Sequence, residues 1–166
     1  IRDIGVTGVQ TCALPIYVKV LFLSFGVSAV FLYTLQLAKH RWLSDTRAFL
    51  LDTTVKTGNP LFAPSWELVT GIKSKTLTED EYTTGYYALM RKSFVDHTPE
   101  WLALFSHPVV VLGCYCPAGN FCHRHLLTDI LEKIAIQERF HFVRGGEITS
   151  KEQLDSLIEF WNKEFE

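Results

Sequence analysis

Short apolar runs separated by polar turns dominate the chain from about residue 30 onward. Three of these runs, VFLYTLQL at 30–37, AFLLDTT at 48–54 and VVVLG at 109–113, are rich in β-branched and aromatic residues. Such runs are typical of strands buried in a parallel sheet. A further short run at 140–143 predicts a fourth strand.

Segments with helical periodicity or helix-start signals alternate with these strands. Thr78 and Glu81 form a capping-box pattern, and Asn120 is expected to cap the helix that follows the third strand. The last helix starts at Ser150 and repeats apolar residues at i, i+3, i+4 and i+7. The predicted helices or helical turns cover, in order, 39–46, 64–71, 78–94, 98–106, 120–136 and 150 onward.

Strands that alternate with helices predict an α/β fold. We expect a small, mainly parallel sheet with helices on both faces, a Rossmann-like three-layer arrangement, formed by 30–166 as one domain. The length of 166 residues suits a single domain. Apolar residues make up 48% and charged residues 20%, which excludes a disordered chain.

The first 29 residues are set apart from this domain. Residues 1–16 match, in frame, the translation of a common sequencing-library adapter, so we interpret them as an artefact and exclude them from the fold. Residues 17–29 form an N-terminal extension whose origin the sequence leaves open.

An uncharged stretch at 20–38 reaches the length of a transmembrane helix. Small and polar residues such as Ser24, Gly26 and Ser28 interrupt it, and its second half has the composition of a buried strand. We therefore do not favour a membrane segment.

The charge and the cysteines narrow the partners and the compartment. A net charge of −2 gives no support for a nucleic-acid partner. Three of the four cysteines fall within 114–122, next to two histidines. This spacing favours metal or thiol chemistry in a reducing, cytoplasmic compartment over a disulfide framework.

Two strand ends carry the candidate chemistry, because ligands of open parallel sheets bind at the carboxyl ends of strands. One is 52–57 (DTTVKT) and the other is 114–125 (CYCPAGNFCHRH). We expect the two to converge in one cleft. Helical geometry turns His123 toward the sheet and His125 toward solvent.

Three interpretations of this site remain open. The first is a nucleophile and anion pocket at a helix N-terminus, which lowers a thiol pKa and favours phosphate. The second is a zinc site formed by Cys114, Cys116, Cys122 and His123. The third is structural, with buried cysteines and a core histidine.

The first interpretation assigns roles without a cofactor. Cys122 is the nucleophile, His123 the acid or base, and Asp52 a base or ribose contact. The expected ligand is a small phosphate-bearing, nucleotide-like molecule. The residues expected to bind it are Arg124 and Lys56 as an anion clamp, together with Thr54, Cys114 and Cys116.

The segments LLDTTVKTG and VVVLGCYCPAGNFCHRHLLTDILEK resemble the domain-of-unknown-function family 488 (DUF488) in its phage-type form. The resemblance covers roughly 30–148. It implies an acidic residue after an early strand (Asp52), a cysteine after a late strand (Cys114) and a Cys-His-Arg triplet that opens a helix. The chain has Asp-Thr-Thr where many members have Asp-Val-Arg, so Lys56 is the expected replacement for the missing arginine charge. The resemblance implies a fold and a site and carries no reaction.

Overall fold

The computed structural model describes residues 29–165, so the adapter-like residues 1–16 and nearly all of the N-terminal extension lie outside the described residues. The elements follow one another as β1 (Val30–Gln36), η1 (Leu37–Leu43), β2 (Phe49–Asp52), α2 (Trp66–Lys73), α3 (Glu79–Asp96), α4 (Thr98–Ala103), η2 (Leu104–Ser106), β3 (Val109–Cys114), α5 (His123–Glu138), β4 (Phe142–Ile148) and α6 (Lys151–Glu164).

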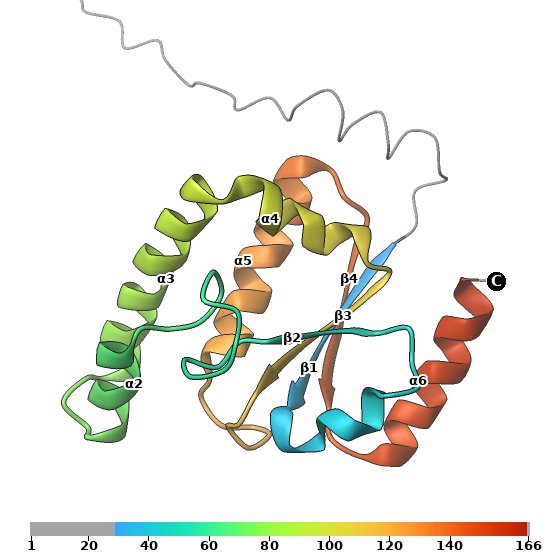
Figure 1. Ribbon diagram of the computed structural model, residues 1–166, viewed down its shortest axis with the longest axis horizontal. Helices are drawn as coiled ribbons and strands as arrows, with labels where there is room; N and C mark the ends of the chain where they lie inside the picture. Colours follow the sequence, from blue (N-terminus) through green and yellow to red (C-terminus); the bar gives the residue numbers. More distant parts are fainter. Residues whose placement is uncertain (1–28, 166) are drawn as a thin grey trace, which may run out of the picture.

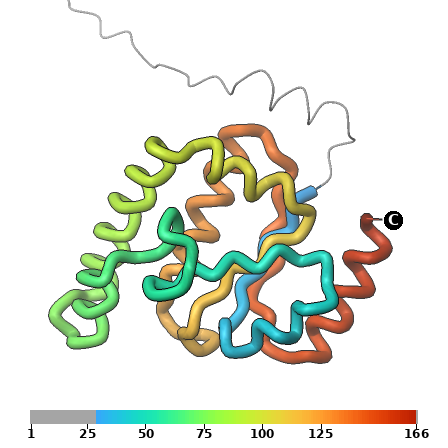
Figure 2. Tube along the Cα trace, viewed as in Figure 1, coloured from blue at the N-terminus to red at the C-terminus, as the bar shows by residue number. Residues whose placement is uncertain are grey.

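A four-stranded parallel sheet in the order β2-β3-β1-β4 forms the middle layer (Figure 1). Helices α3, α4 and α5 pack on one face, and η1 and α6 pack on the other (Figure 2). The predicted α/β class, with a parallel sheet and helices on both faces, is confirmed. The chain leaves β1 toward β2 over one face and leaves β3 toward β4 over the other. The carboxyl ends of β1 and β3 therefore flank a topological switch point.

Alternation along β1 explains how the two cores separate. Val30 and Leu32 pack with α5, whereas Phe31, Tyr33 and Leu35 pack with α6. Successive residues of a strand point to opposite faces. A run that is apolar throughout is therefore suited to the centre of the sheet, where both faces are covered. In the part of the chain that the structure describes, no helix has the length and hydropathy needed to cross a bilayer.

Two helix starts lie further along the chain than the sequence predicts. The helix expected from Pro64 begins at Trp66, because the Ser65 hydroxyl accepts the N–H of Leu68 and caps it. The helix expected to be capped by Asn120 begins at His123, with Cys122 at its N-cap position.

The tight turn before α5 explains the second displacement. The Asn120 N–H donates to the Pro117 carbonyl, and Gly119 has a φ of +77°. The left-handed backbone conformation favours glycine and is not that of a right-handed helix, so the chain at Gly119 is still in the turn. The chain then passes through Asn120, Phe121 and Cys122 before α5 begins at His123.

The fourth strand is longer than predicted. The expected strand at 140–143 becomes Phe142–Ile148, because the polar segment Arg144-Gly-Gly-Glu pairs with β1 in spite of its composition. The register shifts between Leu32 and Tyr33, so that Gly145 is left out of the pairing. A polar strand with a bulge lacks the apolar alternation from which strands are predicted.

We predict that α6 is anchored through Leu154, which is fully buried against the sheet. Replacing Leu154 with alanine should lower the free energy of unfolding by about 2–5 kcal/mol, because a cavity replaces the lost side chain. Urea unfolding followed by circular dichroism measures this change. Ile136→Ala is the matched control, since Ile136 is 72% exposed and should change stability by no more than about 0.5 kcal/mol. Equal changes in the two variants would show that α6 is not a core element.

Candidate functional site

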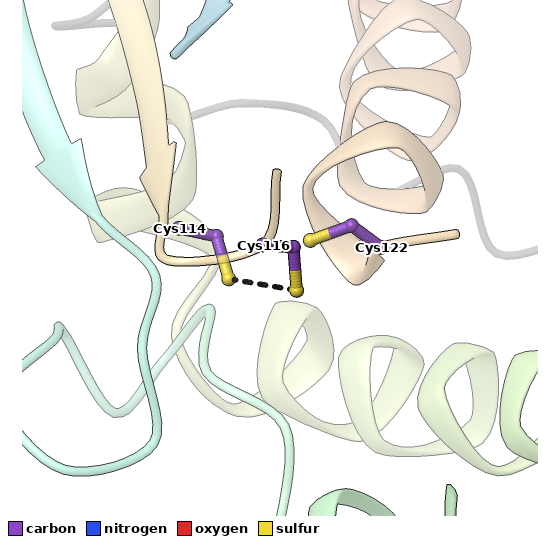
Figure 3. A group of neighbouring side chains, drawn as sticks. All are labelled: Cys114, Cys116 and Cys122. Atoms are coloured by element: carbon purple, nitrogen blue, oxygen red, sulfur yellow. Dashed lines mark hydrogen bonds between the residues drawn. The ribbon is translucent and has the colours of Figure 1, made fainter. Parts of the chain in front are cut away.

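Three cysteine sulfurs meet at the turn between β3 and α5. The sulfurs of Cys114, Cys116 and Cys122 all lie within 4.8 Å of one another, and that of Cys114 is 3.7 Å from that of Cys116 (Figure 3). Cys114 ends β3 and Cys122 precedes α5, and both are buried. Cys116 is half-buried on the connecting loop, which makes it the most accessible of the three.

The cluster has one sulfur that is favoured to carry charge. Hydrogen bonds from Cys114 and Cys122, followed by the positive charges of Arg124 and Lys73, hold the pKa of Cys116 well below that of an ordinary thiol. The same neighbouring sulfurs, together with burial, raise the pKa of Cys122 far above the usual range. These opposite shifts favour negative charge on Cys116 over negative charge on Cys122.

His123 is fixed by the end of the second strand. Its Nε2 lies 2.9 Å from the Thr53 carbonyl oxygen and 3.0 Å from the Thr53 hydroxyl oxygen. A carbonyl only accepts, so Nε2 carries the proton and donates it. Burial lowers the pKa of His123, so the ring is neutral. Its unprotonated Nδ1 then faces the Cys122 sulfur at 3.8 Å.

Arg124 is a buried tie between three segments. Its guanidinium has no exposed surface, and Nη1 donates to the Cys116 carbonyl at 2.7 Å. Nη2 donates to the Pro117 carbonyl and forms an ion pair with Glu147 of β4. The second carboxylate oxygen of Glu147 accepts the Gly119 N–H. These contacts hold the loop, the start of α5 and β4 together. They also use both terminal nitrogens of the Arg124 guanidinium, the group that the sequence analysis expected to bind an anion.

The end of β2 contacts the site through Thr53, a residue that the sequence analysis did not select. Asp52 accepts the N–H of Thr54 at 2.8 Å and the hydroxyl of Thr57 at 2.9 Å, so its carboxylate closes the turn after β2. Thr53, between them, is buried and contacts His123. The two strand ends do converge, but through Thr53, because neighbouring residues point to opposite sides.

Two further side chains at the site also escaped the sequence analysis. Lys56 is exposed, and the lysine whose charge acts on Cys116 is Lys73, at the end of α2. Glu147 pairs with Arg124 from β4. Neither belongs to the motif, and both lie far from it in the sequence, so only the packing of α2 and β4 could reveal them.

A cavity of about 540 Å³ opens at the start of α5. Cys122 and His125 line it together with Phe121, and Glu79 and Glu147 lie at its wall. His125, expected in solvent, is half-buried here, and burial lowers its pKa. The volume falls within the range of small-molecule sites, about 300–1,000 Å³.

The same sulfurs suit a thiophilic metal ion. Two sulfurs bound tetrahedrally to zinc lie about 3.8 Å apart, which the separation of Cys114 and Cys116 matches. The sequence placed His123 in this set. The group that the structure brings together among residues 29–165 is the three cysteines, while Nε2 of His123 is directed to Thr53. Three sulfurs leave a fourth coordination position for an outside ligand.

The comparisons with known proteins give a family. Residues 38–135 match the family model DUF488-N3a, described as the active DUF488-N3 subclade. The matched region runs from η1 to α5 and includes every cysteine of the cluster. No curated protein and no solved structure gives a significant match.

We predict that Arg124 is required for folding more than for ligand contact. Arg124→Met should lower the free energy of unfolding by about 3–5 kcal/mol, because it leaves carbonyls and the Glu147 carboxylate without their partner. Chemical unfolding of the purified protein measures this loss. The control is Arg144→Met, since Arg144 is 43% exposed in its ion pairs and should cost no more than about 1 kcal/mol. An Arg124→Met protein with the stability of the wild type would contradict the role of a buried tie.

Proposed function

Because this chain belongs to the DUF488-N3a family, we propose that it is a thiol-dependent enzyme in which Cys116 is the nucleophile. The observation that carries the proposal is the cluster of three sulfurs around a half-buried cysteine at the mouth of a strand-to-helix turn. The family is described as an active subclade, which supports an enzyme over a purely structural module.

The residues of the site have different roles in the proposed reaction. The thiolate is the reactive form of cysteine, so Cys116 attacks the electrophilic centre of the substrate. The bond to the leaving group breaks with its electron pair, and that group takes a proton from water at the open side of the cavity. His123 is a positioning residue, since its protonated Nε2 holds the start of α5 on Thr53, with Nδ1 3.8 Å from the Cys122 sulfur.

The substrate class that we propose is a phosphate-bearing, nucleotide-like molecule in the cavity at the start of α5. The first-turn N–H groups of a helix lack intrahelical partners and attract anions. Lys73 adds positive charge near Cys116. Phe121 offers an apolar surface in the cavity wall, and Glu79 takes the ribose-contact role that the sequence gave to Asp52.

A second candidate function is a zinc-binding module, and the S–S separation of 3.7 Å favours it. It would use Cys114, Cys116 and Cys122 as ligands and would require all of them as thiolates. In contrast to a closed structural site, a three-sulfur site keeps one position open.

We predict that iodoacetamide alkylates Cys116 at a rate that is nearly constant between pH 5 and pH 8. A lowered pKa keeps the sulfur of Cys116 ionised throughout this range. The alkylation rate of an ordinary thiol, with a pKa of about 8.5, falls about tenfold for each unit by which the pH is lowered. Mass spectrometry of the peptide that contains Cys116 gives the rate, and glutathione alkylated in parallel provides the reference.

Two outcomes would contradict the thiolate assignment. A rate that rises tenfold per unit from pH 5 to pH 8 would describe an ordinary thiol. One equivalent of zinc in the purified protein, with all three cysteines alkylated only after a chelator is added, would establish the metal function instead.

We also predict that nucleotides protect Cys116. A saturating nucleoside monophosphate or diphosphate should slow its alkylation at least about tenfold, because a ligand in the cavity lies against Cys122, whose sulfur is within 4.8 Å of that of Cys116. The unphosphorylated nucleoside is the matched control and should protect less. A panel of nucleotides that leaves the alkylation rate unchanged would remove the proposed substrate class.

A further inference from the structure

A second, smaller cavity adjoins the first. It measures about 140 Å³ and lies between β1, β4 and α5. His125 and Glu147 line both cavities, so the two share one boundary. The remaining lining residues are Leu32, Thr34, Thr128, Arg144 and Gly146.

A buried hydroxyl without a partner faces this small cavity. Thr34 is 4% exposed, and its Oγ1 has no hydrogen-bond partner among the described residues. Thr34 shares the α5 side of β1 with Leu32, which also lines the cavity. A buried hydroxyl is normally satisfied, so an unpartnered one in a cavity indicates a missing partner.

Gly146, which follows the bulge in β4, leaves space at the wall of the cavity. Leu32 pairs with Arg144 and Tyr33 pairs with Gly146, so Gly145 is the unpaired residue between them. A side chain at Gly145 would collide with the Tyr33 ring at 2.0 Å. Gly146 has a φ of +89°, and the space around its missing Cβ is empty for 4 Å. Glycine in a strand interior often marks a close approach by a ligand.

The size and polarity of the small cavity limit its occupant. An engineered cavity of about 150 Å³ accommodates benzene, so 140 Å³ corresponds to a single ring. The charged residues of the lining are paired, Arg144 with Asp129 and Glu132, and Glu147 with Arg124. The Thr34 hydroxyl can both donate and accept. An uncharged ring with a polar edge fits these conditions.

We propose that the small cavity binds the pyrimidine-type base of a nucleotide whose phosphate-bearing end lies at the cysteine cluster. The inference rests on the proposed function, because it extends the same ligand past His125 and Glu147. Thr34 donates to, or accepts from, the polar edge of the ring. We expect a one-ring base to fit better than a two-ring purine, because the volume is close to that of a cavity that binds a single ring.

Binding of uridine, cytidine and adenosine 5′-monophosphates and of ribose 5-phosphate to the full chain tests the proposal by calorimetry. The pyrimidine nucleotides should bind more tightly than the adenosine nucleotide and the base-free ribose 5-phosphate. Thr34→Val, which keeps the shape and removes the hydroxyl, should weaken pyrimidine binding about tenfold, the loss of one hydrogen bond. It should leave ribose 5-phosphate unchanged. Thr34→Ser keeps the hydroxyl and should bind like the wild type.

The outcomes separate this inference from the proposed function. Equal affinities for all four compounds, unchanged in Thr34→Val, would overturn the base subsite and leave the phosphate-binding function standing. The same result would mean that water satisfies Thr34. Binding of none of the four, with Cys116 alkylation unaffected by each, would overturn the proposed function and this inference together.

Discussion

The rest of the site depends on the contacts that the buried guanidinium of Arg124 makes. It joins the carbonyls of the loop after β3 to the Glu147 carboxylate of β4, and it does so from the first turn of α5. Arginine stays charged when buried and presents its donors in a planar fork, so it can bind several acceptors at once. A residue that looks like an anion ligand in the motif is therefore used to shape the site.

The tie made by Arg124 explains why three sulfurs can lie so close together. The loop from Cys114 to Cys122 would separate its ends if its carbonyls were directed to solvent. Held from inside, it brings one half-buried sulfur against two buried ones. The neighbouring sulfurs and burial raise the pKa of Cys122, whereas hydrogen bonds from those sulfurs and the nearby cations lower the pKa of Cys116. The reactivity that we propose for Cys116 rests on this asymmetry.

The sheet topology gives the site its place and its neighbours. The cluster lies beside the switch point between β1 and β3, where the Gln36 amide of β1 donates to the Tyr115 carbonyl of the loop. From β4, which pairs with β1 on the side away from β3, Gly146 and Glu147 line the small cavity, and Glu147 also contacts the loop through Gly119. The larger and the smaller cavity are thus parts of one edge of the sheet, formed by elements distant in sequence.

The sequence by itself determined the α/β class, the order of strands and helices, and the place of the cysteine cluster at the turn after VVVLG. Those features follow from apolar periodicity, helix caps and the local clustering of cysteines, which are all short-range signals. Only the tertiary structure decided the roles within the turn. It closed Asp52 on its own turn, brought Thr53 to His123 and paired Arg124 with Glu147. The physical reason is that the last two contacts join residues 70 and 23 positions apart, and the direction of each side chain depends on packing that no local pattern encodes.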